Sequence, residues 1–326
     1  MIKDTFERYK KNSVMVEGGF TVRSVVITGA TSMLGMALIK ECLINGTEVH
    51  AILRKDSRKL KALPISKLIK TYEYELSEYK TATIPAFHHD ALYHFAWEAT
   101  KGDERYHAES QVRDIGYTLD SIALAEKLGC KKFVGAGSQA EYGRVSGSIS
   151  TDMKVAPDSA YGVAKYAAGR LGGFLCENQG LEFNWARIFS VYGIHDAPHT
   201  MIMYCIDALL KGERPSLTKG EQRWDYLYCE DAARALYLIG ERGISGKTYN
   251  VGSGIVRPLK EYIEALRDAV NPELPLDLGK RAYDKNQVMH LCADISELRK
   301  DTGFEPTVNF EAGICETISW VKESML

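Results

Sequence analysis

Ser24-Val25-Val26-Ile27-Thr28-Gly29-Ala30-Thr31-Ser32-Met33-Leu34-Gly35 is the stretch that decides the fold. Its first five residues form a β-branched run typical of a buried parallel strand, and the residues from Met33 onward have the composition of a helix. Gly29 permits a tight turn, and the helix N-terminus would face an anion such as a pyrophosphate. We therefore expect a dinucleotide at this turn, although the same turn also occurs without a ligand. The expected contacts are Gly29, Thr31, Ser32, Met33, Leu34 and Gly35.

The next strand, expected over residues 48–53, is followed by a cation, Arg54. An acidic residue at this place would bind the ribose hydroxyls of NAD, whereas a cation suits the 2′-phosphate of NADP. Ser57 could donate a further hydrogen bond to that phosphate. Because such charges also occur on ordinary solvated loops, NAD(H) remains possible, but the sequence favours NADP(H).

Short apolar strands alternate with helices over the first two thirds of the chain. This alternation predicts an α/β fold, namely a Rossmann-like doubly wound parallel sheet. The expected strands are 24–28, 48–53, 69–76, 91–96, 132–135 and 182–189, and the expected helices are 33–44, 114–128 and 161–177.

The pattern changes from Gly193, where helices and short strands no longer alternate regularly. We expect a dinucleotide-binding domain over residues 21–192, with return segments near 224–253. Residues 193–326 would mainly form a smaller α/β substrate lobe over the carboxyl edge of the sheet, where ligands bind in such folds. Residues 1–20 are expected to be an N-terminal extension.

The composition excludes several classes of partner. A net charge of −2 over 326 residues gives no bulk attraction to nucleic acid or to an anionic membrane, and no apolar run is long enough to span a bilayer. Seven scattered cysteines without a Cys-x-x-Cys pair predict neither disulfides nor a thiolate metal site. The pair His88-His89 lacks a third ligand at sensible spacing, so no metal is expected. We expect a cytoplasmic protein.

Tyr161 and Lys165 are separated by about one helical turn, so the phenol and the ammonium should share a helix face. A nearby ammonium lowers the pKa of a phenol toward the working pH, where it can give or take a proton. With eighteen tyrosines in the chain, about one such spacing is expected by chance, so the pair alone is weak. Ser138 strengthens it, because this residue would stand at the carboxyl edge of the sheet beside the same helix.

From about Arg23 to the C-terminus, the chain resembles the extended short-chain dehydrogenase/reductases, the superfamily of nucleotide-sugar epimerases, dehydratases and reductases. The resemblance rests on short motifs that follow one another in the expected order. Besides the glycine turn and Tyr161-x-x-x-Lys165, they are Asp-Ala-Leu-Tyr-His-Phe-Ala at 90–96, Ser138 with Tyr-Gly at 142–143, Arg-Ile-Phe-Ser-Val-Tyr-Gly at 187–193, Arg-Trp-Asp-Tyr at 223–226, and Tyr-Asn-Val-Gly-Ser-Gly at 249–254.

The resemblance implies an NAD(P)-dependent enzyme with three catalytic residues. Tyr161 would be the acid/base at the reacting sugar oxygen, and Ser138 would hydrogen-bond the same oxygen. Lys165 would bind the nicotinamide ribose and lower the pKa of Tyr161. The remaining cofactor contacts implied by the resemblance are Glu75 and Leu76 at the adenine, and Ala96, Ile188 and Ser190 toward the nicotinamide.

The resemblance also implies a nucleotide-diphosphate sugar as substrate. Arg223 and Arg281 would bind the diphosphate, although either could be a surface cation with a carboxylate partner. Ser190 would lie near the diphosphate, and Gln139 could bond a sugar hydroxyl. Dehydratases of the family place Asp-Glu directly after the catalytic hydroxyl residue, whereas this chain has Gln139-Ala140. We therefore do not expect loss of water.

The expected activity is NADPH-dependent reduction of a nucleotide-linked keto sugar, with a 4-keto-6-deoxyhexose as the sugar implied by family analogy. The alternatives are an NAD-dependent nucleotide-sugar C4 epimerase and, in another class, a non-catalytic dinucleotide-binding sensor. Family members commonly dimerise through the helices expected at 114–128 and 161–177, so a homodimer is expected. Trp97 and Trp224 could wall the site, but core packing is the simpler expectation for both.

Overall fold

The computed structural model describes residues 22–57, 59–85, 88–100, 102–285 and 287–324. The expected N-terminal extension, residues 1–20, therefore lies outside the described residues.

The centre of the molecule is a seven-stranded sheet with the strand order β10-β6-β5-β4-β1-β2-β3, and all of its pairings are parallel. The chain runs outward from β1 in one direction and then crosses to β4 and runs outward in the other. This order is the doubly wound arrangement that the sequence predicts, with its switch point between β1 and β4. The strands are β1 (Ser24–Thr28), β2 (Glu48–Leu53), β3 (Ile69–Glu73), β4 (Ala91–His94), β5 (Lys132–Ser138), β6 (Glu182–Ile188) and β10 (Thr248–Val251).

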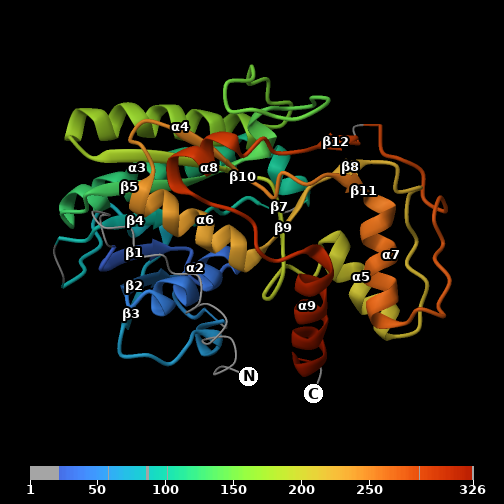
Figure 1. Cartoon of the computed structure of the whole chain (residues 1–326). Helices are drawn as coiled ribbons and strands as arrows, with labels where there is room; N and C mark the ends of the chain where they lie inside the picture. Colours follow the sequence, from blue (N-terminus) through green and yellow to red (C-terminus); the bar gives the residue numbers. More distant parts are fainter. Residues whose placement is uncertain (1–21, 58, 86–87, 101, 286, 325–326) are drawn as a thin grey trace.

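Helices cover both faces of the sheet, which explains the continuously apolar strands (Figure 1). The helices α2 (Met33–Ile44) and α6 (Cys229–Arg242) pack together on one face. The helices α3 (Ala108–Lys127) and α4 (Ala160–Gln179) pack together on the other. Successive side chains of β1 alternate between the two resulting cores, with Val25 in the first and Val26 in the second.

Some elements differ from the predicted ones. The strand β5 extends to Ser138 rather than ending at residue 135, and α3 begins six residues earlier than expected, at Ala108. The strand β3 stops at Glu73, and a 3-10 turn, η2 (Leu76–Glu78), follows it. Where the return segments were expected to begin, Asp225 separates two short strands, 223–224 and 226–228.

A third apolar core lies in the C-terminal part of the chain, on the right in Figure 1. Three helices form it together with two small sheets, which pair in the orders β11-β8-β12 and β7-β9. The helices are α5 (Met201–Leu210), α7 (Leu259–Val270) and α9 (Phe310–Ser324). The strands are β7 (Ser190–Tyr192), β8 (Arg223–Trp224), β9 (Tyr226–Tyr228), β11 (Arg257–Pro258) and β12 (His290–Leu291).

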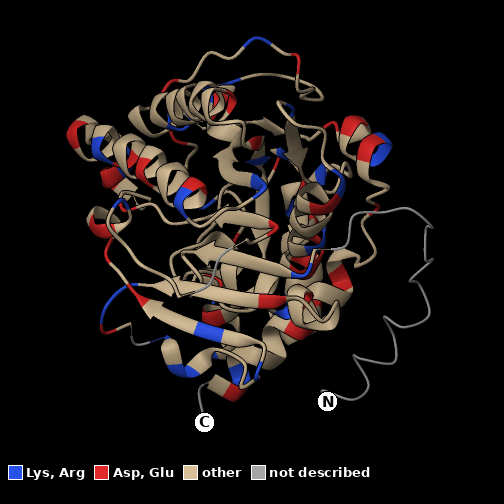
Figure 2. Ribbon diagram, turned by 90° about the vertical axis from the view of Figure 1, so that its left-hand side faces the viewer, with Lys and Arg blue, Asp and Glu red and all other residues tan. Residues whose placement is uncertain are grey.

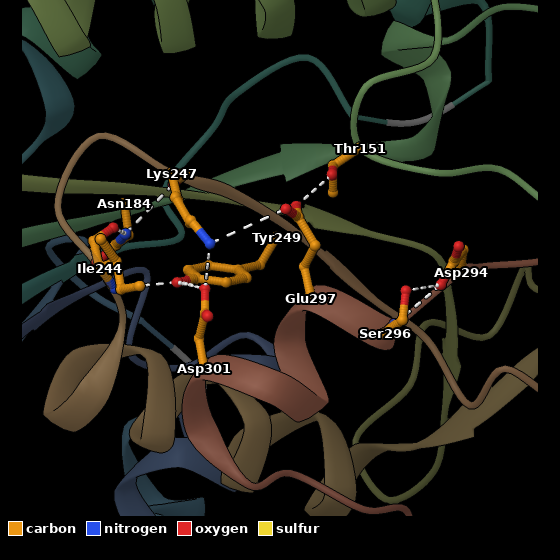
Figure 3. A network of polar contacts seen from close by, with 9 residues as sticks. All are labelled: Thr151, Asn184, Ile244, Lys247, Tyr249, Asp294, Ser296, Glu297 and Asp301. Carbon is orange, nitrogen blue, oxygen red and sulfur yellow. Dashed lines mark hydrogen bonds and ion pairs between the residues drawn. The ribbon is translucent and has the colours of Figure 1, made fainter.

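A polar network fixes α8 (Ser296–Thr302) to the β10 edge of the sheet (Figure 3). The Asp301 carboxylate accepts hydrogen bonds from Lys247 Nζ at 2.6 Å and from the Tyr249 hydroxyl at 2.8 Å. From the same helix, Glu297 accepts a bond from Thr151, which lies in the segment that leads into α4. The network thus links the last strand of the sheet to the approach of the helix that carries Tyr161.

Charged residues of both signs are interspersed along the ribbon of the molecule (Figure 2). This distribution agrees with the small net charge. No helix in the described part of the chain has both the length and the apolarity needed to cross a bilayer.

Candidate active site

The glycine turn lies at the switch point of the sheet, where backbone crowding requires its two glycines. Gly29 has a φ of +65°, and a Cβ added to it would lie 2.7 Å from the backbone nitrogen of Ala96. A Cβ on Gly35 would lie 2.5 Å from the Gly29 carbonyl oxygen. Ser32 caps α2, because its hydroxyl oxygen accepts a bond of 3.1 Å from the Gly35 N–H. The Ser32 proton therefore remains available for an anion at the helix N-terminus.

The residues expected around the adenosine follow β2 and β3. Ser57 Oγ lies 3.5 Å from Thr31 Oγ1, which joins this loop to the glycine turn. Glu75 caps η2 and accepts a bond from the Lys55 N–H, and Leu76 is buried. Arg54 is exposed, and the ion pairs found among the described residues do not include it. Its guanidinium is thus available to a phosphate.

Ser138 ends β5 and begins the 3-10 turn η4 (Gln139–Glu141) in a reciprocal capping arrangement. Its Oγ accepts the Ala140 N–H at 3.2 Å, while Glu141 Oε1 accepts the Ser138 N–H at 2.8 Å. Because the Ser138 oxygen accepts a bond from the backbone, its proton can be donated outward. Ile188 pairs with Ser138 in the register of β5 and β6, and half-buried Gln139 follows Ser138 in the chain.

Close packing of α4 on η4 brings Tyr161 to Ser138. Ser159 caps α4 by accepting the Gly162 N–H at 3.1 Å, and a Cβ on Gly162 would lie 2.3 Å from the Ala140 carbonyl oxygen. Only a glycine at this place lets the first turn of α4 approach so closely. Burial raises the pKa of the Tyr161 phenol, and a side-chain hydrogen bond with Ser138 partly offsets this shift. Ser138 and Tyr161 thus meet above the carboxyl edge of the sheet.

Lys165 shares a helix face with Tyr161, but its ammonium is directed elsewhere. The Lys165 side chain is buried, and Nζ donates to the Ala136 carbonyl oxygen at 2.9 Å. Nζ also lies 3.6 Å from the centroid of the Trp97 ring and 5.8 Å from that of Tyr161. Burial lowers the pKa of Lys165 to about 7.

The lowering of the Tyr161 pKa by Lys165 therefore stays a prediction. Burial is the largest influence on Tyr161 and raises the pKa of its phenol. The cation that lowers this pKa most is Arg105, whose guanidinium carbon lies 4.2 Å from the Tyr161 ring centroid. Arg105 lies in η3 (Gly102–Tyr106), between β4 and α3, where no sequence motif marks it.

Glu141 is a second residue that the sequence analysis missed. It is fully buried, and its carboxylate accepts bonds from Arg187 Nε at 2.8 Å and Trp185 Nε1 at 2.9 Å, besides the Ser138 N–H. Its charge raises the pKa of Lys165 and so favours the ammonium. The pattern Ser-x-x-Glu at 138–141 is a capping box and would have identified Glu141 in the sequence.

Trp97 combines the two roles that the sequence left open. It packs partly against one of the sheet cores, and its ring lies edge-on to Tyr161 with a centroid separation of 6.1 Å. His94 lies as expected for a hydrogen-bonded strand residue, with Nδ1 2.8 Å from Thr28 Oγ1. In the part of the chain that the structure describes, no three His, Cys, Asp or Glu side chains come together in a way that could hold a metal.

A cavity of about 680 Å³ lies in the C-terminal part of the chain, walled by residues of α5, β8, β9 and α7. Arg281 lines this cavity, but Arg223 does not and is exposed. Trp224 lines it instead, because neighbouring strand residues point to opposite sides. The Trp224 indole N–H donates to Ser190 Oγ at 2.9 Å. Arg281 thus lies where it could contact a group in this cavity, and the roles of Arg223 and Arg281 at a diphosphate stay predictions.

The sequence of residues 25–252 matches the model of the NAD dependent epimerase/dehydratase family. The chain belongs to this family. A curated relative, the dTDP-glucose 4,6-dehydratase of Streptomyces niveus, is 24% identical over 92% of this chain and 93% of its own. Another dTDP-glucose 4,6-dehydratase, from Streptomyces griseus, is 26% identical over 71% of each chain.

Solved structures of this family share the fold. The UDP-N-acetylglucosamine 4-epimerase of Methanobrevibacter ruminantium, in complex with UDP-N-acetylmuramic acid, superposes with a TM-score of 0.83 at 23% identity over 94% of this chain and 100% of its own. The UDP-glucuronic acid 4-epimerase of Bacillus cereus, in complex with UDP-glucuronic acid and NAD, gives 0.80 at 20% identity over 92% of this chain and 99% of its own. The Rossmann-like fold is thereby confirmed.

Proposed function

We propose that this chain reduces a keto group on a nucleotide-linked sugar, with NADPH as the preferred hydride donor. The observation that carries the proposal is the hydrogen bond between Ser138 and Tyr161 at the carboxyl edge of the sheet, with Lys165 on the same helix face. A nicotinamide, when bound, supplies the hydride. The chain must then supply a proton to the substrate carbonyl oxygen and a hydrogen bond that holds this oxygen in place.

The residues of the glycine turn fit such a cofactor. Gly29 and Gly35 allow the turn to pack tightly against backbone that a side chain would meet, and the capped N-terminus of α2 is suited to a pyrophosphate. Arg54 supports NADP(H), because a guanidinium forms strong bonds to a 2′-phosphate. Relatives in solved structures bind NAD, so NAD(H) is the alternative cofactor.

In this proposal Ser138 and Tyr161 act on one substrate oxygen. Ser138 donates a hydrogen bond to the carbonyl oxygen and orients it, since its own oxygen is already occupied by the Ala140 N–H. Tyr161 gives its proton to that oxygen as negative charge develops on it. Lys165 would bind the nicotinamide ribose, and Arg281 would bind a diphosphate in the cavity of the C-terminal part.

Reduction is preferred over dehydration because the elimination acids are missing. Gln139 and Ala140 occupy the two places after Ser138. Glu141, the next residue, is fully buried and already accepts bonds from Ser138, Trp185 and Arg187. Its carboxylate therefore has no access to a substrate proton.

A C4 epimerase is the second candidate, because the folds of the UDP-sugar 4-epimerases match this chain over most of its length. An epimerase retains its NAD through the reaction, whereas a reductase exchanges its cofactor. Tightly bound NAD in the purified protein, together with interconversion of two UDP-hexoses without net redox change, would favour the epimerase.

The experiment that tests the proposal follows NADPH absorbance with a panel of nucleotide 4-keto-6-deoxyhexoses. We expect turnover by the natural chain and a loss of at least about 100-fold in kcat for Tyr161→Phe, which lacks the acidic proton. Binding of NADPH should be retained in this variant. Full turnover by Tyr161→Phe would refute the mechanism, and binding without any turnover by the natural chain would favour a sensor.

We also propose a homodimer formed through α3 and α4. These two helices pack side by side and carry large apolar side chains that are exposed in the single chain. The exposed residues are Val112, Val163, Leu171 and Phe174. Sedimentation at micromolar concentration tests this state, and a monomer would refute it.

A further inference from the structure

The buried ammonium of Lys165 contacts two groups of the chain that lie outside its own helix. Nζ donates to the Ala136 carbonyl oxygen at 2.9 Å, and it lies 3.6 Å from the centroid of the Trp97 ring. The second distance is well within the range over which a cation is attracted to the π face of an indole. Because an ammonium has three N–H groups, these contacts leave donor capacity for a ribose hydroxyl.

The charge of this ammonium is closely balanced near neutral pH. Burial lowers the pKa of Lys165 to about 7, which leaves the side chain only partly charged there. The carboxylates of Glu141 and Asp114 favour the ammonium, but both already accept other hydrogen bonds. The Trp97 ring lies directly against Nζ, so its π face is placed to favour the charged form.

The Trp97 ring is itself fixed by a hydrogen bond to α3. Its Nε1 donates to Gln111 Oε1 at 3.0 Å, and Gln111 is buried in the first turns of that helix. The amide of Gln111 also donates to the Ala99 carbonyl oxygen at 2.7 Å and to that of Glu104 at 3.2 Å. The indole therefore cannot rotate away from Lys165 without breaking its bond to Gln111.

We propose that Trp97 is a positioning residue, whose indole face holds the Lys165 ammonium in its charged form and in place for the nicotinamide ribose. A charged Lys165 is also the form that can lower the pKa of Tyr161. The inference rests on the proposed function, where Lys165 has its role at the cofactor. It adds that an aromatic ring from the loop after β4 maintains the charge that this role requires.

The charged and titratable groups around Lys165 come from five elements. Besides burial, Arg105 lowers the pKa of Lys165, whereas the two carboxylates raise it. The groups are His94 of β4, Arg105 of η3, Asp114 of α3, Glu141 of η4 and Tyr161 of α4. The indole carries no net charge, so weakening its π face leaves all of these groups in place and removes only an attraction to the ammonium. The pKa of Lys165 should then fall.

The direct test replaces Trp97 with tryptophans that carry increasing numbers of fluorine atoms on the ring. Each fluorine withdraws electron density from the π face, while the shape of the indole and its N–H change little. The titration of Lys165 is followed by NMR in protein labelled with carbon-13 lysine, and its signal is assigned by its absence from Lys165→Met. The control is the same series at Trp320, which lies in α9 and whose ring contacts His195.

We expect the Lys165 midpoint to fall with each added fluorine, by about one pH unit over the whole series, as the strength of a buried cation–π contact predicts. The series at Trp320 should leave the midpoint unmoved. An unchanged midpoint in folded protein with fluorinated Trp97 overturns the proposal. So does an equal fall with fluorinated Trp320.

The titration requires neither substrate nor cofactor, so it separates this inference from the proposed function. If the natural chain fails to turn over any keto sugar, the proposed function fails but the midpoint still reports on Trp97. Where turnover is observed, the alkaline limb of the pH profile of kcat/KM is a second readout, because kcat/KM follows the ionisation of the free enzyme. Fluorination of Trp97 should move this limb to lower pH by the same amount as the midpoint. A midpoint that moves while the limb stays overturns the role assigned to this charge at the cofactor.

Discussion

The buried pair of Glu141 and Arg187 permits a sharp prediction about stability. Their side chains are 0% and 6% exposed, and Arg187 Nε lies 2.8 Å from Glu141 Oε2. Glu141→Gln retains acceptors for Ser138 and Trp185 but leaves the Arg187 charge buried without its partner. We expect this change to reduce the free energy of unfolding by about 3–5 kcal/mol, the usual cost of removing one member of such a pair. Arg187→Met should cost a similar amount.

The double variant Glu141→Gln/Arg187→Met should recover much of that loss, because no uncompensated charge remains in the interior. Urea unfolding of the four proteins, analysed as a double-mutant cycle, measures the coupling directly. The contrast is the exposed pair of Lys211 and Asp207, where Asp207→Asn should cost less than about 0.5 kcal/mol. Additive effects of Glu141→Gln and Arg187→Met would refute the reasoning, since they would show that the two charges do not depend on each other.

Two further predictions concern cofactor choice and pH. Arg54→Ala should weaken NADPH binding about 10-fold or more and leave NADH binding nearly unchanged, because only NADPH carries the 2′-phosphate. Fluorescence titration with both cofactors measures the two dissociation constants. Equal losses of affinity for NADPH and NADH would contradict a contact between Arg54 and the 2′-phosphate. The pKa of Asp301 is lowered in the folded chain, because the bonds from Lys247 and Tyr249 together outweigh the opposing effect of burial. A lowered folded pKa stabilises the chain above the unfolded pKa, and this contribution disappears as the pH falls through the folded value. The Asp301→Asn protein should therefore lose less stability than the parent protein between pH 5 and pH 2, roughly the range over which such a carboxylate titrates. Melting temperatures measured across that range test this. An equal loss in the two proteins would contradict the reasoning.

The sheet could be predicted because its strands are continuous apolar runs, but the end of β5 could not. Gly135 and Gly137 are weak strand formers, so the sequence favours an end at residue 135. In the structure both glycines pair with β6 and lie under the Trp185 ring. A Cβ at Gly135 would lie 2.3 Å from that ring, so the glycines are required by packing that is invisible in the local sequence.

The early start of α3 had a different cause. Residues 108–113 are mostly polar and have no apolar periodicity, which is why the predicted helix begins at residue 114. Two of the polar side chains near this end are buried and bind the preceding loop: Gln111 binds Ala99, and Asp114 accepts the Glu98 N–H at 2.9 Å. Their partners are backbone groups of an irregular segment, and such contacts leave no pattern in the sequence.

The orientation of side chains on the short strand β8 could not be predicted from the sequence. The strand β8 contains only two residues, Arg223 and Trp224, so no alternation of polar and apolar residues indicates which one faces inward. The structure places Trp224 in the cavity wall and Arg223 outside it. Neighbouring residues of a strand point to opposite sides, so a shift of one residue changes which side chain faces the cavity. Here the side chain that faces the cavity is the Trp224 indole and not the Arg223 guanidinium.

The position of the Lys165 ammonium relative to Tyr161 could not be predicted from the local sequence either. Helical spacing fixes which face Lys165 shares with Tyr161, but it does not fix where a long flexible side chain ends. The ammonium is drawn toward the Ala136 carbonyl and the Trp97 ring, both supplied by segments outside α4. A third segment, η3, supplies the nearer cation, Arg105, without any motif. The spacing of Tyr161 and Lys165 therefore predicts a shared helix face, while segments outside α4 determine where the Lys165 ammonium lies.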